Sequence, residues 1–141
     1  ATRDPRIKAA MPLSPSVPSL GSAQAAFASV DIPWLLMTGT LDDAPVEGVG
    51  SDVDGRLAVY PALPEGDFYE LVLFEGEHHA FTDREVSANQ SPRNPAHHPI
   101  IQAFSTAFWD ATLRGDLSSL KWLRGEGARS VLEPGDTWQY K

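Results

Sequence analysis

The sequence predicts an α/β fold of about three parallel strands with flanking helices. Three short runs are almost continuously apolar, and segments with a helical pattern lie between and after them. Continuous apolar runs are typical of strands covered on both faces, as in a parallel sheet. The 141 residues correspond to one ordinary domain, so we take 1–141 as a single domain. Alternating strands and helices favour right-handed crossovers, which would make the strands neighbours in one sheet.

Each predicted strand runs into a polar or turn-forming segment. The strands are expected at residues 7–13, 33–39 and 68–74. A loop rich in serine and proline follows the first, and pairs of acidic and histidine side chains follow the second and third. Clusters of this kind between apolar runs indicate loops.

Helical patterns are expected at residues 24–27, 53–63 and 99–114. The last is the strongest, because its apolar residues repeat at three- and four-residue steps. Pro99 suits the first turn of that helix and Gly115 its C-terminal end. Asp116 can then cap a further short helix. Trp138 is expected in a C-terminal tail.

The composition excludes several classes of partner and site. Eleven Lys and Arg against nineteen Asp and Glu give a net charge of −8, which argues against binding to nucleic acid or to an anionic membrane surface. No apolar run approaches the roughly 20 residues that a spanning helix needs. The chain has no cysteine, which excludes disulfides, thiolate metal sites and a cysteine nucleophile.

Acidic and imidazole side chains follow two neighbouring strands of the predicted sheet. Asp42 and Asp43 come after the second strand, and His78 and His79 after the third. Sites in open α/β sheets form beyond the carboxyl ends of the strands. A carboxylate that accepts the imidazole N–H fixes the tautomer and stabilises the imidazolium formed during proton transfer. Spacing alone equally allows a polar turn and a solvated loop.

The same segments resemble parts of the α/β-hydrolases. Residues 34–42, Trp-Leu-Leu-Met-Thr-Gly-Thr-Leu-Asp, are similar to the strand and turn that carry the catalytic acid, where an apolar strand ends in Gly-x-x-Asp. Residues 71–81 resemble the final strand and the loop with the catalytic histidine, and residues 100–114 the C-terminal helix that covers the sheet. Within the superfamily, dienelactone-hydrolase-like and polyester-hydrolase-like esterases are the most similar. The resemblance covers residues 6–123.

The resemblance implies an acid and a base in this chain. Asp42 fits the Gly-x-x-Asp spacing from Gly39, whereas Asp43 is one residue late, so we favour Asp42 as the acid.

Two histidines remain candidates for the base. The distance from the end of the strand at Leu73 favours His78. The patterns Gly-x-x-His and His-x-Phe instead select His79, through Gly76 and Phe81. We lean slightly towards His78 and keep both.

The chain departs from the family at the nucleophile. The family carries serine in a Gly-x-Ser-x-Gly elbow upstream of the acid, and no such pentapeptide occurs here. Gly50-Ser51 is the nearest match, but it follows Asp42. We therefore expect the C-terminal half of a carboxylic ester hydrolase, acting without a cofactor on a small-molecule or polymer ester. Its partner would be the missing N-terminal half, or a second chain at the sheet edge.

Two other readings are weaker. The alternative function is a non-catalytic α/β binding or dimerisation module whose contact is the sheet edge before Ile7. A metal site could combine His97-His98 with the earlier histidine pair, but adjacent histidines rarely both face one ion, so we expect no metal. Residues 52–55 open like a calcium loop without its later ligands, and we expect a helix entry there.

Overall fold

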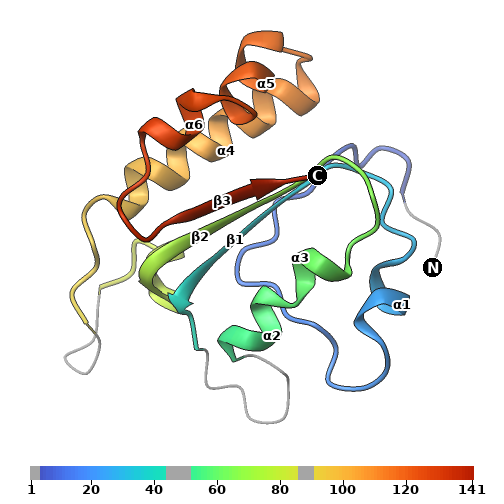
Figure 1. The fold of residues 1–141 in the computed structure, drawn as a ribbon, viewed down its shortest axis with the longest axis horizontal. Coiled ribbons are helices and arrows are strands. Elements are labelled where there is room, and N and C mark those ends of the chain that lie inside the picture. Colours follow the sequence, from blue (N-terminus) through green and yellow to red (C-terminus); the bar gives the residue numbers. More distant parts are fainter. Residues whose placement is uncertain (1–3, 44–51, 86–90) are drawn as a thin grey trace.

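The sheet is mixed and has helices on both faces (Figure 1). The computed structural model describes residues 4–43, 52–85 and 91–141. Its strands are β1 (Trp34–Leu41), β2 (Phe68–Glu77) and β3 (Thr137–Tyr140), in the order β1-β2-β3. The helices are α1 (Ala23–Phe27), α2 (Val53–Leu57), α3 (Val59–Ala62), the 3₁₀ helix η1 (His78–Phe81), α4 (His97–Leu113), α5 (Leu117–Leu123) and α6 (Glu126–Ser130).

Alternate residues of the central strands pack into two separate clusters. Leu35 and Met37 of β1 face α4, α5 and α6, where they pack in a cluster with Phe104. Leu36 points the opposite way and packs in a second cluster with Val59 of α3. Because successive side chains of a strand point to opposite faces, a run that is apolar throughout needs cover on both sides. The α/β class expected from the apolar runs is therefore confirmed in this general form.

The expectation of three parallel strands was only partly right. The strands predicted at 33–39 and 68–74 are β1 and β2, and they pair in parallel. Residues 7–13 do run parallel to β1, but only as isolated bridges, Ala10 with Trp34 and Leu13 with Met37. Pro12 can contribute only its carbonyl, which accepts from Met37 N at 3.1 Å, and it thereby interrupts the ladder.

The C-terminal segment is the third strand, not the tail that we expected. β3 pairs antiparallel with β2, with Trp138 opposite Leu71. Trp138 is 6% exposed, and its indole Nε1 donates to the carbonyl of Leu123 at 2.9 Å. β3 has only four residues, and only one of their side chains is buried. Such a short segment shows no apolar run or alternation, so the sequence pattern did not predict this strand.

The helix predictions hold with shifted boundaries. The predicted helix 99–114 is α4, and Asp116 caps α5 by accepting from the backbone N–H groups of Ser118 and Ser119. The single helix expected at 53–63 is divided into α2 and α3 at Ala58. Within the described ranges, no helix combines the length and apolar character needed to cross a bilayer.

Candidate active site

Asp42 lies at the centre of a cluster of polar contacts just beyond β1. Its side chain is fully buried. Oδ2 accepts from Ser14 Oγ at 2.6 Å and from Thr38 Oγ1 at 2.8 Å. Oδ1 lies 2.9 Å from His78 Nδ1 and 3.3 Å from Arg56 Nε. A buried carboxylate needs such partners, because an unpaired charge away from water is costly.

A change of register between β1 and β2 brings Asp42 and His78 together. Gly39 pairs with Leu73, but the next pair is Leu41 with Glu77, so β2 contains extra residues at this point. Asp42 directly follows Leu41, and His78 directly follows Glu77. The acid and the imidazole are therefore the first residues past two adjacent parallel strand ends, where open α/β sheets carry their sites.

The hydrogen bond between Asp42 and His78 leaves Nε2 of the imidazole available. Because a carboxylate only accepts, Nδ1 donates to Asp42, and Nε2 is then the nitrogen with the free lone pair. Nε2 makes no hydrogen bond to residues 4–43, 52–85 or 91–141, and 56% of the side chain is exposed. An imidazole oriented in this way can take a proton at Nε2.

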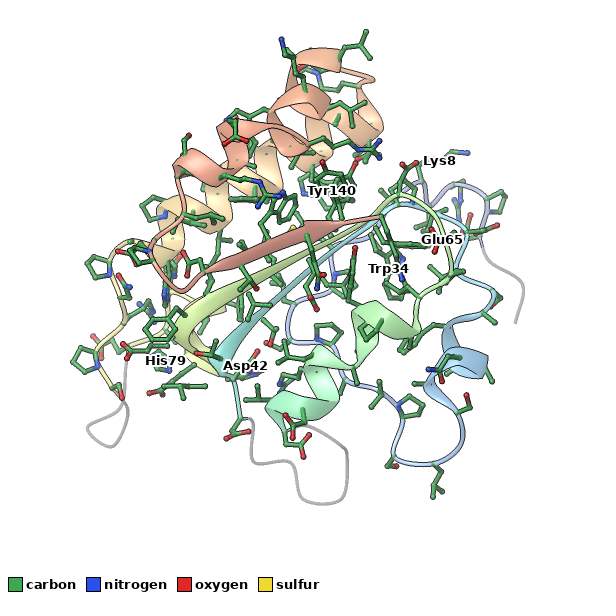
Figure 2. The ribbon with its side chains drawn as sticks, in the orientation of Figure 1. Lys8, Trp34, Asp42, Glu65, His79 and Tyr140 are labelled. Carbon is green, nitrogen blue, oxygen red and sulfur yellow. The ribbon has the colours of Figure 1, made fainter. Side chains whose placement is uncertain are left out.

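His79 has a different environment from His78. Its side chain is 11% exposed, and Nδ1 lies 3.3 Å from Glu77 Oε2. Figure 2 shows His79 at the same end of the sheet as Asp42. The His79 side chain, however, lines a small cavity together with His97. Of the two histidines that the sequence left open, His78 is the one hydrogen-bonded to Asp42.

Asp43, the other acidic candidate, contacts the start of a helix. It is exposed, and its Oδ1 accepts from the backbone N–H of Val53 at 3.2 Å, in the first turn of α2. Asp52 caps the same helix by accepting from Gly55 N at 2.8 Å, so the expected helix entry at residues 52–55 is confirmed. The other sequence candidate, Gly50-Ser51, lies outside the described residues.

Sequence reasoning missed three residues that surround the carboxylate. Ser14 ends the irregular segment beside β1 and has a φ of 51°, a left-handed conformation uncommon for serine. Thr38 lies in β1, four residues before Asp42. Arg56 of α2 is only 3% exposed, although arginine is a residue type that is mostly exposed. No periodic pattern identifies such residues, because their role depends on contacts between distant segments.

The two histidines that begin α4 contact backbone carbonyls. His97 is buried, and its Nε2 lies 3.1 Å from the carbonyl oxygen of Phe74. His98 Nε2 lies 3.0 Å from the carbonyl oxygen of Ala80. In the part of the chain that the structure describes, no group of three or more His, Asp and Glu side chains is arranged to hold a metal ion.

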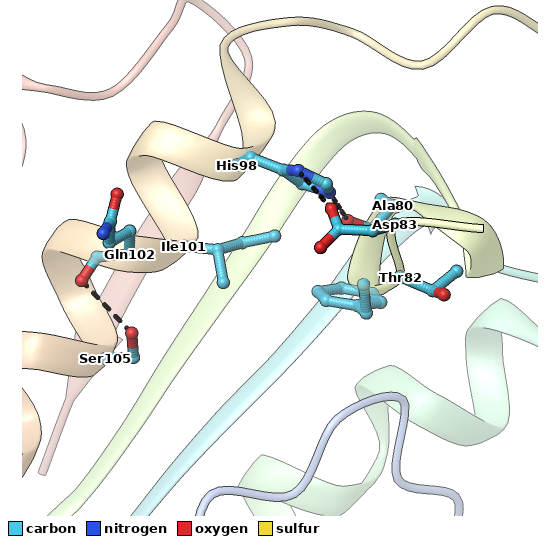
Figure 3. A pocket seen from close by; sticks show the side chains of 8 residues that line it. Ala80, Thr82, Asp83, His98, Ile101, Gln102 and Ser105 are labelled. Atoms are coloured by element: carbon cyan, nitrogen blue, oxygen red, sulfur yellow. Dashed lines mark hydrogen bonds and ion pairs between the residues drawn. The ribbon is translucent and has the colours of Figure 1, made fainter. Parts of the chain in front are cut away.

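A pocket of about 360 Å³ opens between η1 and α4 (Figure 3). It contains a second serine, histidine and aspartate set: Ser105, His98 and Asp83. His98 Nδ1 is 3.3 Å from Asp83, but its other nitrogen is taken by the Ala80 carbonyl. Ser105 donates to the carbonyl of Gln102 at 3.1 Å. This set therefore lacks the hydrogen bond between nucleophile and base that serine activation requires.

Comparisons with known proteins find no match to this chain among protein-family models, curated proteins or solved structures. The chemistry of the site is therefore argued from its geometry.

Proposed function

We propose that this chain supplies the acid and the base of a carboxylic ester hydrolase of the α/β-hydrolase type. One observation carries the proposal: the exposed imidazole of His78 is held by the buried carboxylate of Asp42 across a 2.9 Å hydrogen bond. The two residues follow neighbouring parallel strands, β1 and β2. The order of acid before base along the chain is also that of the α/β-hydrolases.

The nucleophile in this proposal is a serine upstream of Asp42 in the complete protein, on a segment that is not part of this 141-residue sequence. His78 Nε2 takes the proton of its hydroxyl as the oxygen attacks the ester carbonyl carbon, and Asp42 stabilises the imidazolium. Backbone N–H groups of that other segment would hold the resulting oxyanion. His78 then gives its proton to the departing alcohol, leaving an acyl-enzyme. Water, deprotonated by the same nitrogen, releases the carboxylic acid and restores the serine.

Ester hydrolysis by the protein that contains this chain tests the proposal. A p-nitrophenyl ester measures turnover, and a fluorophosphonate probe detects an activated serine. We expect Asp42→Asn to lower kcat by about 10⁴-fold and His78→Gln by about 10⁶-fold, since each removes one member of a proton-transfer unit.

Neighbouring residues provide matched controls. Asp43→Asn and His79→Gln change the same residue types one position along, and we expect both to keep most of the activity. If His78→Gln retains wild-type kcat, or if no serine is labelled in the active protein, the proposal is wrong.

A second candidate function is a binding module that pairs through the sheet edge at residues 7–13. Ala10 N donates to the carbonyl of Pro33 in the connection to β1. The backbone N–H groups of the residues on either side of Ala10 therefore point away from β1, because these groups alternate in direction along an extended chain. Among the described residues, the N–H groups of Ala9, Met11 and Leu13 make no hydrogen bond. Free strand edges accept an added strand. Sedimentation of the chain discriminates, because a monomer at high concentration argues against pairing between copies.

A further inference from the structure

Arg56 of α2 joins the ends of two segments that meet at the site. Its Nε donates to the carbonyl oxygen of Asp42 at 2.6 Å and lies 3.3 Å from Oδ1 of the same residue. Its Nη1 donates to the carbonyl oxygen of Ser14 and lies 3.4 Å from Ser16 Oγ. One side chain thus contacts the main chain after β1 and the main chain after the segment beside it.

The contacts of Arg56 are more than charge compensation. The guanidinium is 3% exposed, and burying a cation without a partner is strongly unfavourable. In the described ranges, Asp42 is the only carboxylate within ion-pair distance of it. Yet the shorter contact is to the Asp42 carbonyl and not to its carboxylate. A bond to the carbonyl fixes where the main chain of Asp42 lies, which an ion pair alone does not.

Arg56, Ser14 and Asp42 form a closed ring of contacts. Ser14 accepts from Arg56 through its carbonyl and donates through Oγ to Asp42 Oδ2. Asp42 returns to Arg56 through its own carbonyl. With Oδ2 occupied by Ser14 and Thr38, Oδ1 remains for the imidazole. The ring therefore selects which carboxylate oxygen faces His78.

We infer that Arg56 is a positioning residue that orients Asp42 towards His78 by clamping the carbonyls of Asp42 and Ser14. Its effect on rate rests on the proposed ester hydrolysis, whereas its effect on the hydrogen bond does not. Lysine would keep the charge but not the planar fork of donors, so the two residues are not interchangeable here.

The hydrogen bond can be observed without catalysis. An imidazole proton held by a carboxylate gives a downfield ¹H NMR signal, which His78→Gln assigns in the 141-residue chain by its loss. We expect Arg56→Lys and Arg56→Met to shift or abolish this signal. Arg124→Met is the matched control, because Arg124 pairs with Asp67 at 2.6 Å at the opposite end of β2. It should leave the signal in place.

Two outcomes of the NMR experiment overturn the inference. The first is a folded Arg56→Met or Arg56→Lys chain whose downfield signal is unchanged. The second is failure of both variants to fold, since Arg56 would then be a stability residue and not a positioning one.

Kinetics separate this inference from the proposed function. In the active protein we expect Arg56→Lys to lower kcat about 10–100-fold with KM unchanged, as for other losses of orientation near a reacting group. Added guanidinium ion should partly restore Arg56→Ala. If Arg56→Lys is fully active while Asp42→Asn is inactive, the positioning role is wrong and the esterase proposal stands. If the wild-type protein hydrolyses no ester, the esterase proposal fails and the NMR result alone decides the role of Arg56.

Discussion

Gly39 and Gly76 meet where β1 and β2 change register, and the contact leaves no space for a side chain on Gly39. A Cβ on Gly39 would lie 2.7 Å from the Cα of Gly76 and would also collide with its carbonyl oxygen. The contact lies at the point where the pairing of Gly39 with Leu73 gives way to that of Leu41 with Glu77. Close approach of the two backbones therefore accompanies the shift that brings His78 beside Asp42.

Gly39→Ala should destabilise the fold strongly for this reason. The clash is with backbone atoms that cannot rotate away, so we expect a loss near the upper end of overpacking costs, about 3 kcal/mol. Urea unfolding followed by circular dichroism measures it. Gly21→Ala is the control: a Cβ there meets nothing within 4 Å, and only its φ of 88° opposes alanine. That strain costs about 1–2 kcal/mol. Equal midpoints for Gly39→Ala and wild type would contradict the close contact.

The sequence was most informative where local pattern and tertiary role coincide. β1 and β2 are buried on both faces, so their apolar runs identified them, and α4 was found from its periodic stripe. Asp42 and Asp43 could be ranked only by spacing from Gly39. Their different environments depend on α2, since Asp43 reaches its Val53 N–H group.

Other features depend on contacts that no local window contains. Arg56 is distinguished from a surface arginine by its burial and by its contacts with Asp42 and Ser14, which lie far from it in the sequence. The segment at residues 7–13 is apolar enough for a strand, yet Pro12 reduces it to isolated bridges. In β3 only Trp138 is buried, and it is buried by residues that lie elsewhere in the chain. The four residues of β3 themselves therefore give little indication of a strand.

Trp138→Ala should show that the C-terminal strand belongs to the core. The indole stacks on Tyr69 with 5.7 Å between ring centroids and meets Phe104 edge-on at 4.5 Å. Replacing a buried tryptophan by alanine typically costs about 3–5 kcal/mol. Thr137→Ala, at the adjacent exposed position of β3, should change the free energy of unfolding by no more than about 0.5 kcal/mol. Urea unfolding at constant m-value measures both, and similar small losses for the two variants would indicate that β3 is only loosely attached.

Glu70 provides a test of stability against pH. It is a buried carboxyl in β2 whose Oε2 accepts from Gln139 Nε2 at 2.5 Å. Burial raises the pKa of Glu70, and the hydrogen bond from Gln139 and the charge of Lys141 oppose that rise only in part. The folded state thus holds the Glu70 proton to higher pH than the unfolded chain does.

The sign of the effect follows from proton linkage. Below the unfolded pKa both states are protonated and Glu70 costs nothing, but between the unfolded and the raised folded pKa the folded state binds more protons. Stability therefore falls as pH rises through this interval, and the full penalty is present above the folded pKa. Glu70→Gln keeps an acceptor for Gln139 without the titrating group. We expect this variant to gain stability over wild type as pH rises from about 4 to 8.

Urea unfolding of wild type and Glu70→Gln across this pH range gives the difference directly, which removes the contribution of the other carboxyl groups. Glu65→Gln makes the same substitution at an exposed position just before β2 and is measured alongside as the surface control. The difference in free energy of unfolding between Glu70→Gln and wild type should therefore change with pH. If it stays constant, or shifts in favour of wild type as pH rises, the Glu70 carboxyl is better solvated than its buried position in β2 indicates.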